Sequence, residues 1–214
     1  MEVQMLFKNG ITQATDVELL AALLGNRGTA ATLLWQAGGS LFSLLNGDRQ
    51  TDADLFCADS TGAYADDPII KLLAARELAT RAIVEELRGR DCLDSPSAVR
   101  DLLKHRLAGL PHEMFVCMQL DNQNRLIAYE ELFRGTLTQT SVYPREVVKA
   151  CLRVNAAGVI FAHNHPSGIA EPSRADELLT RALRDALALV DVKVLDHFIV
   201  AGTSTLSFAE RGLI

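Results

Sequence analysis

The sequence predicts an α/β fold in which helices flank a mixed β-sheet, with a small all-helical domain in front. Two apolar runs, MFVCMQL at 114–120 and AAGVIFA at 156–162, have the length and composition of buried strands. Segments with the spacing of amphipathic helices follow at 143–155 and 173–190. This alternation of strand and helix indicates helical layers packed on a sheet.

Helical periodicity covers the first part of the chain. Thr15 or Asp16 predicts the cap of a helix, VELLAALL, that ends at Gly25, and a second segment, TAATLLWQA, also ends at glycines. A helical period returns over 69–87, where apolar residues recur on or near one face. We expect these helices to form a small domain over residues 1–90.

Two segments interrupt the helical pattern. Residues 46–67 hold six aspartates and predict an acidic loop or a weak helix flanked by turns. Around RGRDCLDSPSA, charged residues, glycine and proline indicate a domain boundary near residue 90. Beyond it we expect a single domain over 91–214, which begins with a helix near 97–107.

The remaining strands are predicted from their boundaries. The turn DNQN at 121–124 follows the first apolar run, so RLIAYEELF is expected to return as the second strand of a hairpin. VKVLDHFIV at 192–200 predicts a last long strand, and LSFAERGL closes the chain. The order helix, strands, helix, strand, helix, strands implies a mixed sheet.

Composition excludes several classes of protein. The 214 residues are 49% hydrophobic and 22% charged, which excludes disordered and collagen-like chains. A net charge of −6 disfavours non-specific nucleic-acid binding. The sequence has no apolar run of the roughly 18 to 20 residues that span a bilayer, and MEVQMLFKNG does not resemble a signal peptide, so we expect a cytoplasmic protein. Four cysteines without a CxxC pair predict reduced core thiols.

Three side chains of the metal-binding type follow the second apolar run. His163 and His165 are two residues apart, so an extended strand end projects both rings to the same side. Ser173 begins the next helix and places Asp176 in its first turn, pointing back toward the loop. Two imidazoles and one carboxylate leave a tetrahedral Zn²⁺ with an open position. The pattern therefore predicts a catalytic zinc site rather than a structural one.

The segment SRAD also fits a simpler interpretation. Ser173 as N-cap and Asp176 three positions later form a capping box, which by itself is typical of an ordinary helix start. An isolated His-x-His pair is likewise a weak indication of metal binding. Both interpretations can hold together, because a capped first turn is a rigid place to mount a ligating carboxylate.

The joint spacing of these residues is more specific than either part. His163-x-His165, seven residues, Ser173, two residues and Asp176 resemble the JAMM motif of the MPN-domain metalloproteases. The segments LIAYEELFRGTL, SVYPREVVK, NAAGVIFAHNHPSG, PSRADE and VLDHFIV are similar to the RadC branch of that superfamily. The resemblance extends from about residue 92 to the C-terminus and implies an MPN (JAB/JAMM)-like fold.

The resemblance implies a role for each residue of the motif. His163, His165 and Asp176 would hold the zinc, and Ser173 would support the tetrahedral intermediate. The implied reaction is hydrolysis of an amide bond in a peptide or protein, in which zinc lowers the pKa of a water molecule toward roughly 7. Nothing in the sequence selects a particular substrate or an oligomeric state.

A general base is also implied by the resemblance, as a glutamate at the start of an upstream strand. Glu113, immediately before MFVCMQL, is the leading candidate, and Glu130 and Glu131 are alternatives because they precede LFRGT. His197 is a single histidine within the apolar VLDHFIV, which predicts a satisfied core residue or one that supports the site from behind.

Two alternative functions remain open at the level of sequence. One is a factor associated with DNA repair or recombination, and the other is a metal-binding domain that recognises a peptide without cutting it. RadC relatives carry an N-terminal helix-hairpin-helix whose glycine-rich turn binds a DNA phosphate. Here only Gly62 remains of that pattern, and Asp66 and Asp67 would repel a phosphate, so we do not expect this hairpin to bind DNA.

Overall fold

The computed structural model describes residues 11–46, 67–135 and 142–214. The chain divides into two compact units, Met1–Ala79 and Thr80–Ile214, and helix α5 (Pro68–Gly89) runs through the division. The boundary near residue 90 that composition suggested stays a prediction. Most of the acidic segment at 46–67, with Gly62 and Asp66, lies outside the described residues.

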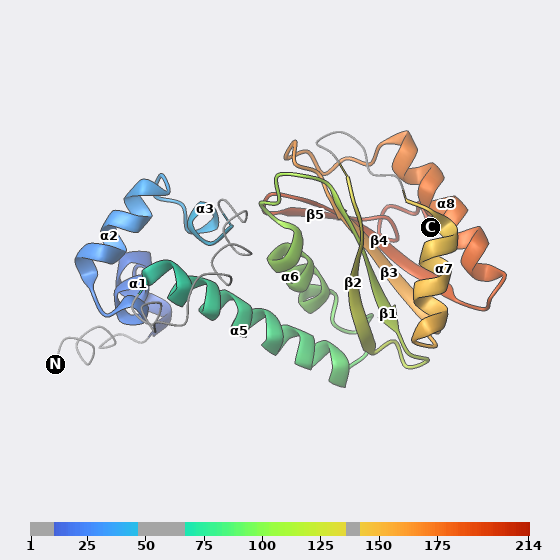
Figure 1. The fold of residues 1–214 in the computed structure, drawn as a ribbon, viewed down its shortest axis with the longest axis horizontal. Helices are drawn as coiled ribbons and strands as arrows, with labels where there is room; N and C mark the ends of the chain where they lie inside the picture. The colour runs from blue at the N-terminus through green and yellow to red at the C-terminus, as the bar shows by residue number, and fades with distance from the viewer. Residues whose placement is uncertain (1–10, 47–66, 136–141) are drawn as a thin grey trace, which may run out of the picture. The chain divides into compact units, whose positions relative to one another are not determined.

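The first unit is helical, and α1 begins and ends at the residues that the sequence indicated, whereas α2 begins at Arg27, two residues before the predicted segment. Thr15 caps α1 and Gly25 ends it in the left-handed conformation, with φ of 74°. Helices α1 and α2 lie side by side (Figure 1). The described helical elements of this unit, besides the first part of α5, are η1 (Ile11–Gln13), α1 (Asp16–Leu24), α2 (Arg27–Gln36) and α3 (Leu41–Asn46). Its buried core consists of Leu20, Ala21, Leu24, Ala30 and Leu72.

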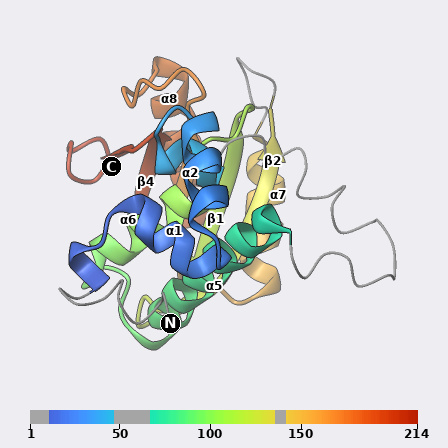
Figure 2. The same cartoon turned by 90° about the vertical axis from the view of Figure 1, so that its left-hand side faces the viewer.

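A five-stranded mixed sheet forms the centre of the second unit. The strands lie in the order β2-β1-β3-β4-β5, and the pair β3–β4 is parallel whereas the other three pairs are antiparallel. Figure 2 shows the sheet from another side, with β2 and β4 on opposite sides of β1. The strands are β1 (Met114–Leu120), β2 (Leu126–Arg134), β3 (Gly158–Asn164), β4 (Lys193–Ala201) and β5 (Ser204–Ser207). The predicted α/β class and mixed sheet are confirmed.

Helices cover both faces of this sheet. Helices α7 (Pro144–Arg153) and α8 (Arg174–Ala188) pack on one face, and α6 (Pro96–Leu107) contacts β3 and β4 from the other (Figure 1). β1 and β3 are buried along their whole length, as expected for strands covered on both sides. Among the described residues, none of the helices has both the length and the apolar character of a membrane span.

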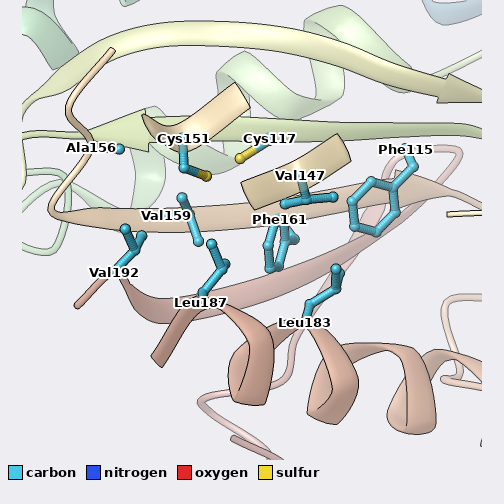
Figure 3. Close-up of a cluster of buried hydrophobic side chains, with 10 residues drawn as sticks. All are labelled: Phe115, Cys117, Val147, Cys151, Ala156, Val159, Phe161, Leu183, Leu187 and Val192. Carbon is cyan, nitrogen blue, oxygen red and sulfur yellow. The ribbon is translucent and has the colours of Figure 1, made fainter. Parts of the chain in front are cut away.

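The core on the α7 and α8 face joins alternate residues of β1 and β3 to both helices. Figure 3 shows Leu183 and Leu187 of α8 reaching toward this face, with the sulfur atoms of Cys117 and Cys151 close to each other. Cys92, Cys117 and Cys151 are free and buried, which confirms the prediction for these three thiols, whereas Cys57 lies outside the described residues. The remaining members of the cluster are Phe115, Val147, Ala156, Val159, Phe161 and Val192.

Strand β3 extends two residues further than the apolar run predicted. His163 and Asn164 belong to the strand, whose pairing with both β1 and β4 continues to its end. His163 is therefore held by the sheet and not by a loop. Beyond it, the backbone N–H of His165 still donates to the carbonyl of Val200, at 2.8 Å, which fixes the strand end as well.

Candidate metal centre

His163, His165 and Asp176 converge on the α8 side of the sheet, where β3 ends. The Nε2 atoms of His163 and His165 lie 2.9 Å apart. The carboxylate of Asp176 reaches both rings, with Oδ1 at 3.3 Å from Nε2 of His163 and Oδ2 at 3.6 Å from Nε2 of His165. The three side chains together can hold a metal ion. Their exposed fractions are 6%, 14% and 16%, so the group is largely withdrawn from solvent.

Asp176 is placed by the first turn of α8. Ser173 is the N-cap, and its hydroxyl accepts a hydrogen bond from the N–H of Asp176 at 3.1 Å. In return, Oδ2 of Asp176 accepts from the backbone N–H and from the hydroxyl of Ser173, both at 2.7 Å. The capping box and the convergence on the histidines therefore coexist in one residue. Ser173 orients the carboxylate, while its role toward an intermediate stays a prediction.

The second ring nitrogen of each histidine is also engaged. Nδ1 of His165 lies 2.8 Å from the carbonyl oxygen of Ile169, an acceptor, so this nitrogen carries a proton, and in the neutral ring the Nε2 lone pair faces the group. Nδ1 of His163 lies 2.9 Å from Nε2 of His197, which is fully buried in β4. Such hydrogen bonds behind an imidazole fix its tautomer and orientation.

Electrostatics favour a charged carboxylate next to the rings. Burial alone would raise the pKa of Asp176, but its contacts with His163 and His165 and with the Ser173 hydroxyl outweigh burial and hold that pKa well below its usual range. The Asp176 carboxylate raises the pKa of His165, and the charge of Glu113 adds to the effect. Burial lowers the pKa of His197 far below its usual value, so that ring is neutral.

Glu113 immediately precedes β1, and the strand register indicates where it lies relative to the same group. In the β1–β3 pairing Phe115 is opposite His163, and continuing this antiparallel register by two residues sets Glu113 opposite His165. Side chains directly opposite in an antiparallel pair lie on the same face, and the Phe115 and His163 rings are stacked, with centroids 6.4 Å apart. The register therefore puts Glu113 on the face that carries both histidines.

Asn164 ties the segment around Glu113 to the end of β3. Its side chain points to the face opposite to that of its two histidine neighbours, as alternation in a strand requires. There Oδ1 accepts from the backbone N–H of Met114 at 2.8 Å, and Nδ2 donates to the carbonyls of His112 at 3.0 Å and Leu110 at 3.4 Å. One buried amide thus fixes the backbone on both sides of Glu113.

The two alternative glutamates lie elsewhere on the hairpin. Glu130 is opposite Cys117 in the register and forms an ion pair with Arg153 of α7 at 2.5 Å. Glu131 is exposed and opposite Val116, whose side chain belongs to the other face of β1. Glu130 shares the face of the histidines but lies level with Cys117 and is engaged by Arg153, so of the three candidates Glu113 is the one whose extended register position is opposite a histidine.

A cavity of about 530 Å³ is lined in part by the loop that follows His165. Ile169, whose carbonyl holds His165, forms one wall together with Ala170 and Glu171. The other side is formed by β5 and the C-terminal turn, through Thr205, Leu206, Ser207, Glu210 and Arg211. None of the three metal-binding side chains lines the cavity. Ile169 is the residue that contacts both, because it lines the cavity and its carbonyl bonds to His165.

Sequence reasoning did not single out Asn164 or Thr180. Thr180 lies in α8, where its hydroxyl is 2.6 Å from Nδ1 of His197 and 2.6 Å from the carbonyl oxygen of Asp176. A threonine inside an amphipathic helix carries no signal that distinguishes it from a surface residue. His197 was predicted to be satisfied in the core or to support the site, and its hydrogen bonds to His163 and Thr180 agree with that expectation.

Comparison with known proteins shows which family the sequence of this chain matches. A family model described as a RadC-like JAB domain matches residues 93–213, more than half of the chain. A UPF0758 protein of Leptothrix cholodnii is 55% identical over 212 residues, covering 96% of this chain and 92% of the relative. UPF0758 proteins of Nitrosospira multiformis and Nitrosomonas eutropha are 53% and 50% identical over 213 and 211 residues, each covering 99% of this chain and 94% of the relative.

Proposed function

The chain belongs to the RadC family of proteins with a JAB domain, and from this premise we propose that it is a zinc-dependent hydrolase of the JAMM type that cleaves an amide bond in a peptide or protein. The observation that carries the proposal is the spacing of the three donor atoms. In a tetrahedral site with zinc–ligand distances of about 2.0–2.1 Å, neighbouring ligand atoms are about 3.3–3.4 Å apart. The two Nε2 atoms are 2.9 Å apart, the Asp176 carboxylate approaches one through Oδ1 at 3.3 Å and the other through Oδ2 at 3.6 Å, and one donor atom from each of the three residues lies within 4.8 Å of the others, so the group is close enough to converge on one ion.

The donor set supports zinc and an open position. Two neutral imidazole nitrogens and one carboxylate oxygen suit Zn²⁺, and three protein ligands leave the fourth position of a tetrahedron free. Bound zinc would supply Lewis acidity, which activates a water molecule and polarises the carbonyl of the scissile amide.

The chain's own residues would supply the remaining chemistry. Glu113, which faces His165 across the β1–β3 register, would accept the proton of the attacking water and return it to the leaving amine. Ser173 would hold the carboxylate of Asp176 in its ligating orientation through the two hydrogen bonds at 2.7 Å. Asn164 would keep the backbone of residues 110–114 in place while the carboxylate of Glu113 acts.

Metal analysis combined with a cleavage screen tests the proposal. The purified full chain is expected to carry about one zinc ion, and to cleave members of a library that contains both peptide and isopeptide bonds. His163→Ala should remove the metal and the cleavage together. A wild-type protein that purifies without zinc and does not bind added zinc would contradict the proposed metal site.

Glu113→Gln separates the use of the metal from its binding. Because Glu113 is not a ligand, the variant should keep its zinc and lose about 10²- to 10⁴-fold of the rate. Glu131→Gln, on the exposed side of the same hairpin, is the matched control and should retain both zinc and rate. Full activity of Glu113→Gln would place the general base elsewhere, and zinc without any cleavage would favour a metal-binding domain that recognises peptides.

A further inference from the structure

A chain of three buried side chains lies behind the proposed zinc site. His163 contacts His197 through Nδ1 and Nε2 at 2.9 Å, and Nδ1 of His197 contacts Oγ1 of Thr180 at 2.6 Å. The chain ends at the backbone carbonyl of Asp176, 2.6 Å from the same hydroxyl. It therefore begins at one proposed ligand and ends at the backbone of another.

The carbonyl at the end of this chain determines where each proton lies. A carbonyl oxygen only accepts, so the Thr180 hydroxyl donates its single proton to Asp176. Nδ1 of His197 must then donate to Oγ1 of Thr180. The ring of His197 is fully buried among Phe115, Phe161 and Phe208, surroundings that disfavour a charged imidazolium. Its Nε2 is therefore an acceptor.

The consequence for His163 follows directly. Since Nε2 of His197 accepts, Nδ1 of His163 donates to it, and Nε2 of His163 retains the lone pair that faces Asp176 and His165. With the opposite order of protons, Nε2 of His163 would carry hydrogen and could not bind a metal ion. The direction of the hydrogen bonds thus selects the ligating tautomer.

We propose that His197 and Thr180 are positioning residues that hold His163 in its metal-binding tautomer and set its place relative to Asp176 before the metal binds. This inference rests on the proposed zinc site, and neither residue touches the metal. His165 is held differently, by the carbonyl of Ile169 in the following loop. Within the described part of the chain, Nδ1 of His165 bonds to this backbone carbonyl and not to a buried side chain.

Thr180→Val and Thr180→Ser form a matched pair for the test. Valine has the shape of threonine without the hydroxyl, whereas serine keeps the hydroxyl in the same place. We expect Thr180→Val to bind zinc about 10- to 100-fold more weakly in competition with a chromophoric chelator, the range typical of residues that orient a ligand. Thr180→Ser should stay close to the wild-type affinity. His197→Phe, which keeps a buried ring but removes both nitrogens, should show at least the loss of Thr180→Val.

A second readout does not depend on zinc. Side-chain ¹⁵N chemical shifts of the metal-free protein distinguish the two tautomers of a histidine, and those of His163 should report the Nδ1–H form in the wild type and in Thr180→Ser. In Thr180→Val the signal should shift toward a mixture of both forms. A residue that merely fills the core would leave this signature unchanged, even if its replacement lowered the melting temperature.

The outcomes distinguish a failure of the proposed zinc site from a failure of the positioning role of His197 and Thr180. A wild-type protein that binds no zinc refutes the proposed function, and the inference falls with it. If the wild type binds zinc and Thr180→Val binds it equally tightly, or keeps the wild-type tautomer of His163, the inference alone is overturned. If His197→Phe does not fold, the threonine pair decides the question.

Discussion

Helices α1 and α8 begin with the same local motif, a capping box. In α1 the Thr15 side chain accepts from the N–H of Glu18, whose carboxylate accepts from the Thr15 N–H at 2.8 Å. In α8 Ser173 and Asp176 make the same reciprocal pair of bonds. Sequence alone predicts a helix start at both places with equal justification.

What surrounds the two carboxylates differs completely. The capping-box bonds of Glu18 are made at the surface, whereas Asp176 faces two imidazoles that arrive from the end of β3. The shorter side chain of aspartate also keeps the carboxylate close to the first turn. A capping box therefore becomes part of a candidate metal site through its tertiary neighbours, and not through its own pattern.

The two units that contain these helices also differ in the polar content of their cores. All the buried polar side chains in the described part of the chain belong to the unit Thr80–Ile214, while the described core of the first unit is apolar. Burying a polar group is costly unless it is hydrogen-bonded, and in the described part of the chain all of these side chains except Gln119 have hydrogen-bond partners. They are Thr80, Gln119, His163, Asn164, Thr180, Asp196, His197 and Ser207.

Removing the charge from each capping carboxylate should give the largest contrast. We expect Asp176→Asn to weaken zinc binding by about 1,000-fold or more, beyond the 10- to 100-fold effect of residues that only support a ligand. Glu18→Gln should leave zinc affinity unchanged, because Glu18 lies in the other unit. Isothermal titration of metal-free protein with zinc measures both. Equal zinc affinities for the two variants would show that Asp176 acts only in capping α8.

A pair of buried amides tests whether hydrogen bonding or burial alone stabilises the polar core. Asn164→Ala removes three hydrogen bonds, among them the one that satisfies the Met114 N–H. We expect a loss of roughly 2–4 kcal/mol in the free energy of unfolding, measured by urea denaturation, since a buried donor left unpaired costs about 1–3 kcal/mol.

Gln119 provides the matched control. Its side chain is fully buried, and its amide oxygen and nitrogen have no hydrogen-bond partner among the described residues. Gln119→Met should therefore be neutral or stabilising, because no hydrogen bond is lost and a polar group leaves the core. If the two substitutions cost the same, the bonds made by Asn164 contribute nothing beyond its burial.

Much of the architecture was predictable because its causes are local. The apolar runs, the DNQN turn and the two capping residues predict the β1–β2 hairpin and the helix starts that the structure has. The spacing of His163 and His165 predicts that both rings share a face, because side chains in a strand alternate with a period of two. Their approach to Asp176 follows from the short connection between β3 and α8.

The rest depends on contacts between residues far apart in the sequence. Asn164 bonds to the N–H of a residue 50 positions away, and His163 to an imidazole 34 positions away. No periodicity or motif carries such pairings. Likewise, the β1–β3 register favours Glu113 over Glu130 and Glu131, and a sequence that shows three glutamates near two strands leaves that register undetermined.

The capping hydroxyls offer a smaller contrast between the same two helices. Thr15→Ala and Ser173→Ala should each reduce the stability of their helix by about 1 kcal/mol, since each removes the acceptor for an N–H of the first turn. Hydrogen exchange of the α1 and α8 amides measures these losses. Ser173→Ala should in addition weaken zinc binding by roughly 10-fold, because the hydroxyl also orients Asp176. A zinc affinity unaffected by Ser173→Ala would limit that residue to capping.

The smallest expected effect is the pH dependence of the exposed box in α1. Hydrogen bonds from the backbone N–H and hydroxyl of Thr15 lower the pKa of Glu18 from its ordinary value of 4.5. A carboxyl whose pKa is lower in the folded state contributes stability that is present above pH 4.5 and is lost as the pH falls through the folded pKa. Amide exchange over α1 should therefore show wild type more protected than Glu18→Gln near pH 6, with the difference shrinking as the pH falls below 4.5. Because the capping box lies at the surface, salt should shrink the difference further, and a difference that did not diminish as the pH fell below 4.5 would show that the charge of Glu18 is not its source.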